Sequence, residues 1–268
     1  MNHSAQPPRI TIDAVLRSAL RAFAAFPGPG LAYFGVVTVW NCYDSADSQL
    51  DLADLASFPA GPWVFGAALS LAGSLLMGWL MCGLARVAIA GVRGEEATWN
   101  NTVVSLSEYF HAASALGTWL LATLLGLMLF IVPGIFAFLM WSQAFCSAID
   151  RKESWTAALG RSRLISKGHY AEIFGVGVAT GMLLLPGWIL SASTLWNSAT
   201  DIEEILGGAM PAASKSAAAA FDPAAAATMI LSAALGAAAY TAMTYIGAAL
   251  YVVLQDLYVA AQASKKVD

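Results

Sequence analysis

Tyr109–Ile149 reads YFHAASALGTWLLATLLGLMLFIVPGIFAFLMWSQAFCSAI and contains no Asp, Glu, Lys or Arg. As one α-helix this run would be about 60 Å long, twice the ~30 Å thickness of the hydrocarbon core of a bilayer. Near its middle stand Pro133 and Gly134, a pair that commonly ends one helix and starts another. We therefore predict a helical hairpin with its turn at this pair. Its two spanning helices are expected at Ala113–Val132 and Ile135–Ile149.

The composition of the chain points to lipid as its main solvent. Hydrophobic residues make up 59% of the 268 residues and charged residues 11%, and the mean hydropathy is +0.67. Soluble domains are typically about half apolar and about a quarter charged. This composition excludes a soluble globular protein. The net charge of −4 gives no indication of nucleic-acid binding.

Further charge-poor runs predict the other spans, because a spanning helix needs about 20 mostly apolar residues. These spans are expected at Pro29–Tyr43, Pro62–Arg86, Ile173–Leu195 and Thr228–Gln255. The predicted fold class is all-α, a single integral membrane domain over residues 1–268 with six transmembrane helices. Residues 201–227 contain an Ala-rich stretch with two prolines and are expected to form an extracytoplasmic loop.

The distribution of basic residues predicts the orientation, because cytoplasmic loops concentrate Lys and Arg. With six spans and both termini inside, twelve of the thirteen basic residues are cytoplasmic, and only Lys215 lies outside. A five-span arrangement without the hairpin would export the basic segment from Arg151 to Lys167. The sequence therefore favours six spans, with the N- and C-termini in the cytoplasm of a bacterial cell and the chain in its inner membrane.

Three segments between the spans are expected to form cytoplasmic amphipathic helices. They are Ile10–Phe26, Thr98–His111 and Ser154–Lys167. In the first, Ile12, Leu16, Ala19, Leu20 and Phe23 share the predicted apolar face. The third has a basic face that can lie against anionic lipid headgroups or a protein partner. The candidate lipid- or partner-facing residues are Arg151, Lys152, Arg161, Arg163 and Lys167.

Several short motifs occur in a characteristic order along the chain. After the hairpin turn come Asp150 at the end of a predicted span, Ala157-Ala158-Leu159-Gly160-Arg161-Ser162-Arg163-Leu164, and Lys167-Gly168. Arg93-Gly94-Glu95 follows the second predicted span, and Leu250-Tyr251 lies in the sixth. In these features the chain resembles a six-span bacterial family that includes the membrane domain of some glycerophosphodiester phosphodiesterases and the YciC-like inner-membrane proteins.

The resemblance implies a membrane role without catalysis. In that family the phosphodiesterase activity belongs to a separate soluble barrel domain, which we do not expect here because the chain ends soon after its last predicted span. The membrane part of the family has no assigned catalytic residues, so the resemblance transfers none to this sequence.

Ionisable residues in membrane helices are functional candidates by default. Arg86, Asp150, Glu172 and Asp256 are all expected at the inner boundary of the membrane, where Arg86 would pair with one of the three carboxylates. Such a cluster can fix helix packing or anchor depth, and the alternative is a role in gating or proton coupling. Gln143 is expected near the middle of its span. A polar side chain at this depth either makes an interhelical hydrogen bond or contacts a ligand.

The sequence contains no convincing catalytic, cofactor or metal site. Glu108 and His111 form a Glu-x-x-His pair as in di-iron bundles, but those bundles need a second copy and further carboxylates. Cys42, Cys82 and Cys146 have no metal-binding spacing. We therefore expect no enzyme and no cofactor.

Two functions remain open after this exclusion. The favoured one is a non-enzymatic scaffold or accessory subunit of a membrane complex, which binds membrane lipids and either a membrane-protein partner or further copies of itself. The alternative is a transporter or lipid-handling protein with a cavity around Gln143 and the Arg86 cluster.

Overall fold

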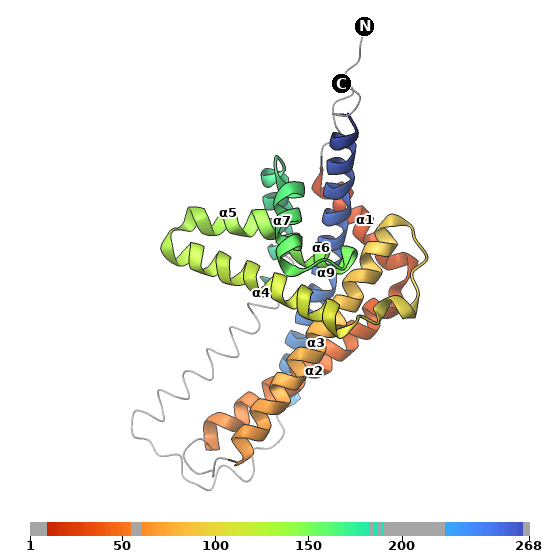
Figure 1. Cartoon of the computed structure of the whole chain (residues 1–268). Helices are drawn as coiled ribbons and strands as arrows, with labels where there is room; N and C mark the ends of the chain where they lie inside the picture. Colours follow the sequence, from red (N-terminus) through yellow and green to blue (C-terminus); the bar gives the residue numbers. More distant parts are fainter. Residues whose placement is uncertain (1–9, 55–60, 183–184, 187–188, 190–222, 265–268) are drawn as a thin grey trace. The chain divides into compact units, whose positions relative to one another are not determined.

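The structure is a computed structural model that describes residues 10–54, 61–182, 185–186, 189 and 223–264 (Figure 1). All regular elements in this part of the chain are helices, which confirms the predicted all-α class. In chain order they are α1 (Ile12–Ala25), α2 (Pro27–Asp54), α3 (Gly61–Arg93), the 3₁₀ turn η1 (Trp99–Thr102), α4 (Leu106–Leu129), α5 (Ile131–Trp141), α6 (Ala144–Arg151), α7 (Trp155–Ser166) and α9 (Pro223–Ser264). Residues 170–182 are also helical.

Helix length and hydropathy identify this chain as a candidate multi-pass membrane protein. Within the described residues, four segments are long and apolar enough to cross a bilayer, namely Ala68–Arg93, Leu106–Leu129, Ile131–Arg151 and Ala226–Ser264. The α1 helix and Pro27–Tyr43 meet at a bend of 93°, and this pair makes a fifth candidate if it forms one broken span. The predicted span Ile173–Leu195 and the predicted loop at 201–227 lie partly outside the described residues, and residues 223–227 belong to α9.

The chain folds as two compact units. The first contains Met1–Tyr33, Ala72–Thr180 and Thr241–Asp268, and the second contains Phe34–Leu71 and Gly181–Tyr240. In the second unit, Ala233 and Ala237 of α9 are buried, which fits the small-residue spacing of this helix. The polar groups discussed below belong to the first unit.

Small residues form most of the core of the first unit. Its buried cluster consists of Cys82, Ala85, Val104, Tyr109, Ala112, Ala115, Ala144, Ala148, Ile149, Ala158 and Leu159. Gly83 of α3 lies so close to the segment before α4 that a Cβ atom there would overlap the Thr102 carbonyl oxygen. Small side chains allow such close approach, which favours helix association where water supplies no hydrophobic driving force.

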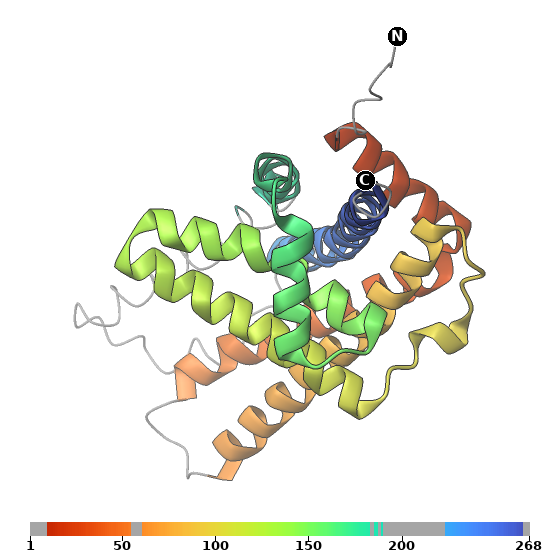
Figure 2. The same cartoon turned by 45° about the horizontal axis from the view of Figure 1, so that its top comes forward.

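The helices α4 and α5 pack against each other as the predicted hairpin, and both views show this hairpin extending away from the region where α3, α6 and α9 meet (Figures 1 and 2). Its turn is at Phe130, whose backbone is extended. This corrects the predicted turn at Pro133 and Gly134, which lie in the first helical turns of α5. The N–H groups of the first turn have no acceptor within the helix, so a proline, which lacks an N–H group, is tolerated there.

Glycines and one tryptophan hold the hairpin together. A Cβ atom on Gly126 would lie 2.7 Å from the Gly134 Cα atom, closer than side chains allow. Further from the turn, Trp119 Nε1 of α4 donates a hydrogen bond of 3.1 Å to the Phe138 carbonyl oxygen of α5. Towards the turn, large apolar side chains such as Met128 and Phe130 are mostly exposed, as expected for a surface that faces lipid.

The three predicted amphipathic helices agree with the structure to different extents. The prediction of a helix at Ser154–Lys167 is confirmed by α7, whose buried residues include Ala158, Leu159, Ser162 and Ile165. The segment Thr98–His111 is not one helix, because η1 is followed by an extended segment and then by the start of α4. In α1 the buried face is Val15, Ala19 and Ala22, whereas the predicted apolar residue Leu20 is 67% exposed.

Candidate functional site

Two buried carboxylates of the first unit, Glu108 and Asp150, each bind several charged or polar side chains. Only 12% of the Glu108 side chain and 7% of the Asp150 side chain are exposed. We call Glu108 with Arg86 and Lys152 the Glu108 cluster, and Asp150 with Arg93, Tyr251 and Gln255 the Asp150 cluster. A buried carboxylate is stable only when cations and hydrogen-bond donors surround it, so each cluster fixes the positions of its helices.

The Glu108 cluster joins α3, the N-terminus of α4 and the residue after α6. Ser105 caps α4 through a capping box, in which its hydroxyl accepts from Glu108 N and its own N–H donates to Glu108 Oε2. Arg86 Nη2 lies 2.6 Å from Glu108 Oε2, and Lys152 Nζ lies 3.0 Å from Oε1. Arg86 also donates to the Val103 carbonyl oxygen. One carboxylate is thus shared between two cations.

The Asp150 cluster joins α3, α6 and α9. Arg93 makes a bidentate ion pair with Asp150 at 2.5 and 2.8 Å, a geometry that fits the planar guanidinium group. The Tyr251 hydroxyl donates to Asp150 Oδ2 over 2.9 Å, and Arg93 also donates to Gln255 Oε1. Gly94 ends α3 directly after Arg93 with a φ of 73°, a left-handed conformation that glycine adopts without strain.

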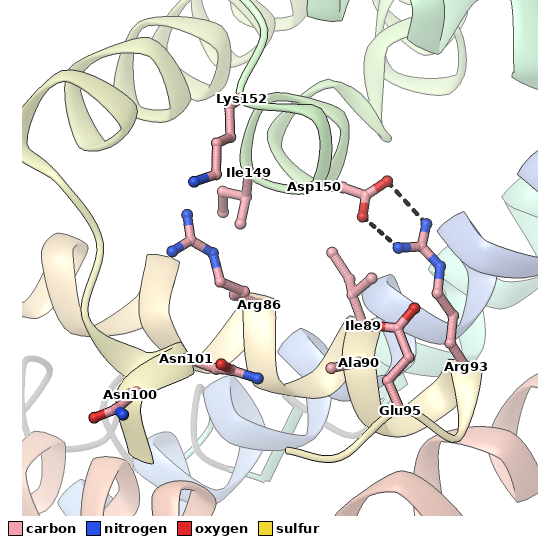
Figure 3. Close-up of a pocket in the computed structure, with 10 residues that line it drawn as sticks. All are labelled: Arg86, Ile89, Ala90, Arg93, Glu95, Asn100, Asn101, Ile149, Asp150 and Lys152. Carbon is pink, nitrogen blue, oxygen red and sulfur yellow. Dashed lines mark hydrogen bonds and ion pairs between the residues drawn. The ribbon is translucent and has the colours of Figure 1, made fainter. Parts of the chain in front are cut away.

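A polar pocket of about 370 Å³ lies between these clusters (Figure 3). Its apolar lining residues include Ile89 and Ile149. Figure 3 shows Arg86 and Lys152 pointing toward each other on one side, and the Arg93–Asp150 pair with Glu95 on the other. The remaining lining residues are Ala90, Asn100 and Asn101.

The structure brings together only part of the predicted charge cluster. Arg86 and Asp150 line the same pocket, but Arg86 pairs with Glu108 in place of any of the three expected carboxylates. The reason is that α4 begins at Leu106 and its capping box turns Glu108 toward α3. Glu172 lies 3.8 Å from His169, and Asp256 is exposed on α9.

Gln143 lies at a break within the candidate span Ile131–Arg151, between α5 and α6. Its side chain is buried, and its Oε1 has no hydrogen-bond partner among the described residues. Ser162 of α7 bridges the break, since its hydroxyl donates to the Met140 carbonyl oxygen and accepts from Gln143 N. Gln143 does not line the polar pocket that Arg86 lines.

The five basic residues predicted to face lipid or a partner differ in their ion pairs and exposure. Lys152 pairs with Glu108, Arg151 lies 3.7 Å from Asp150, and Arg161 pairs with Glu153 at 2.6 Å. The Glu153 carboxylate raises the pKa of the Arg161 guanidinium above its ordinary value through this hydrogen bond. Two further cations, Arg163 and Lys167, are exposed and form no ion pair with the part of the chain that the structure describes.

Glu108, Arg93 and Tyr251 were not predicted as site residues. The motif Ser105-x-x-Glu108 was readable as a capping box, which would have placed Glu108 at the start of a helix. Arg93 and Tyr251 belong to the motifs Arg93-Gly94-Glu95 and Leu250-Tyr251, which were not assigned to a site. In the structure both bind Asp150, so three positions on which the family resemblance rests meet in one cluster.

No metal site accompanies these clusters in the described part of the chain, because it contains no group of three or more His, Cys, Asp or Glu side chains that could hold an ion. Comparison with protein-family models, with curated proteins and with solved structures found no match to this chain. The fold and the charged clusters therefore define it as a helical, candidate multi-pass membrane protein with a polar pocket at the ends of two candidate spans.

Proposed function

We propose that this chain is a non-enzymatic integral membrane protein that acts as a scaffold or accessory subunit of a membrane complex. The observation that carries this proposal is an exposed surface at the end of α7, where Arg163, the 53% exposed Leu164 and Lys167, directly after the helix, lie close together in the chain. Two cations without ion pairs among the described residues, beside an exposed apolar side chain, suit a partner with acidic and apolar groups. The resemblance to the six-span family supports the same role.

Native mass spectrometry of gently solubilised protein tests this function. We expect a second protein, or a second copy of this chain, to remain bound to the wild type and to be lost from the double variant Arg163→Glu and Lys167→Glu. The control is Arg17→Glu, which changes an exposed arginine on α1. A bare monomer in every sample would exclude the scaffold role.

We also propose the predicted topology of six spans, with both termini in the cytoplasm of a bacterial cell and the chain in its inner membrane. The segment that contains Lys167 is then cytoplasmic. In a variant whose three native cysteines are replaced, a cysteine at Lys167 should resist an impermeant thiol reagent in intact cells and react after permeabilisation. Labelling in intact cells would contradict this topology.

A second candidate function is a transporter or lipid-handling protein, and the broken span at Gln143 favours it. Transporters often bind substrates where a membrane helix is interrupted, and the Gln143 Oε1 atom is buried there without a described partner. A lipid or metabolite ligand should raise the melting temperature of the wild type and of Gln262→Leu, an exposed control, but not of Gln143→Leu. Equal stabilisation of all three proteins, or of none, would remove this candidate.

A further inference from the structure

We propose that the polar pocket binds the headgroup of a membrane phospholipid that carries both a phosphate and an ammonium group. In this arrangement the phosphate lies against Arg86 and Lys152, and the ammonium group lies toward Glu95. The proposal is independent of the scaffold role, since it concerns a lipid and not a protein partner.

The position of the pocket indicates a lipid. Its lining residues come from the last turns of α3 and α6, from Lys152 directly after α6, and from the segment after α3 (Figure 3). The candidate spans Ala68–Arg93 and Ile131–Arg151 end at these same turns. Where apolar spans end, the hydrocarbon core gives way to the headgroup layer, so this pocket opens at the depth of lipid phosphates.

The charge on one side of the pocket favours a phosphate. Arg86 and Lys152 share Glu108 as their carboxylate, which leaves one net positive charge there. Both also have spare donors, because the structure gives Lys152 one ion pair for three N–H groups and Arg86 two acceptors for five. A phosphate oxygen can accept from both cations without breaking their bonds to Glu108.

The charge on the opposite side favours an ammonium group. Asp150 pairs with Arg93 through two hydrogen bonds and also lies 3.7 Å from Arg151, which does not line the pocket, whereas the Glu95 carboxylate does line it and forms no ion pair with the described residues. Figure 3 shows the Glu95 carboxylate across the pocket from Arg86 and Lys152. A purely anionic headgroup would face this carboxylate, while a headgroup with both charges satisfies each side.

The volume and lining of the pocket fit such a ligand. A volume of about 370 Å³ lies in the ~300–1,000 Å³ range of small-ligand sites. The apolar lining residues Ile89, Ala90 and Ile149 supply a surface for the glycerol end of the headgroup.

Lipid titration followed by native mass spectrometry tests the proposal on the full chain in an uncharged detergent. The probes are a phosphatidylethanolamine and a phosphatidylglycerol with the same acyl chains, together with water-soluble phosphoethanolamine. We expect the phosphatidylethanolamine to bind most tightly. Loss of one charge-assisted contact should weaken its binding by about tenfold in Lys152→Gln and in Glu95→Gln.

Two variants with the same change of charge serve as controls. Arg21→Gln and Glu96→Gln alter exposed residues that do not line the pocket, and both should bind the lipid as the wild type does. Binding of the phosphatidylglycerol should be weakened by Lys152→Gln but not by Glu95→Gln. Unchanged affinity in both pocket variants would overturn the site, and equal affinity for the soluble compound and the lipid would overturn the assignment to a lipid.

Discussion

The substitution Asp150→Asn removes the charge at the centre of the Asp150 cluster while it keeps the size of the side chain. It leaves Arg93 without its ion pair, although Gln255 still accepts from it and 28% of its side chain is exposed. Removal of one partner from a buried ion pair typically costs about 3–5 kcal/mol. Because water still reaches part of Arg93, we expect a loss of about 2–3 kcal/mol in the free energy of unfolding.

Thermal unfolding in a mild uncharged detergent measures this loss, which corresponds to a melting temperature lower by about 5–10 °C in a chain of this size. The control is Asp256→Asn, an exposed carboxylate on α9, which should stay within about 0.5 kcal/mol of the wild type. A double-mutant cycle with Arg93→Gln isolates the pair, and the double variant should be less destabilised than the sum of the two single variants.

The cycle also defines the result that refutes this reasoning. If Asp150→Asn unfolds within about 0.5 kcal/mol of the wild type, the bidentate pair contributes nothing to the joining of α3 and α6. If the effects of Asp150→Asn and Arg93→Gln are additive, the two residues act separately and the cluster is not a unit.

Two further predictions use matched pairs within one helix. The variant Gly126→Ala should lower the melting temperature in detergent, because its Cβ atom meets the backbone of Gly134. Its control is Gly117→Ala in the same helix, which has open space and should be neutral or stabilising by about 0.5–1 kcal/mol. Equal effects of the two variants would mean that the hairpin does not pack this closely. The variant Ser162→Ala should cost about 1–3 kcal/mol of unfolding free energy, because it leaves buried backbone groups at the α5–α6 break without partners. Its control, Ser166→Ala, removes a buried hydroxyl that has no described hydrogen bond and should cost less, so a larger loss there would contradict the assigned role of Ser162.

The hairpin was predictable because its signals are local. A charge-free run of this length exceeds one membrane thickness, and a Pro-Gly pair marks an interruption near its middle. The turn itself was misplaced by a few residues, since Pro133 is compatible with the first turn of α5 as well as with a loop. Sequence therefore located the interruption but not the residue at which the backbone reverses.

The buried face of α1 was mispredicted because large apolar residues were assigned to the core. In the structure Leu20 is 67% exposed and Ala22 is 2% exposed, and a Cβ atom on Gly91 of α3 would lie 3.2 Å from the Ala22 Cβ atom. Small residues allow two helices to approach, while lipid accepts large apolar side chains without cost. In such a chain, small residues indicate a packed helix face better than large apolar ones do.

The ion pairs could not be assigned from the sequence, because each depends on which helix ends meet. The separation between Arg93 and Asp150 is 57 residues, and that between Asp150 and Tyr251 is 101 residues. Only the capping box of Ser105 and Glu108 is a local pattern. It gives the start of α4, but the identity of the two cations on Glu108 follows from tertiary structure alone.

These separations also set an order of assembly during synthesis, which proceeds from the N-terminus. Arg86 and Glu108 are 22 residues apart, so their bond can form once α4 has left the ribosome. The Arg93–Asp150 pair follows with α6, but its contacts to Tyr251 and Gln255 wait for α9, which follows these helices in the chain. The α9 helix thus docks on a pair that earlier helices have already built, and without α9 the Asp150 cluster lacks Tyr251 and Gln255.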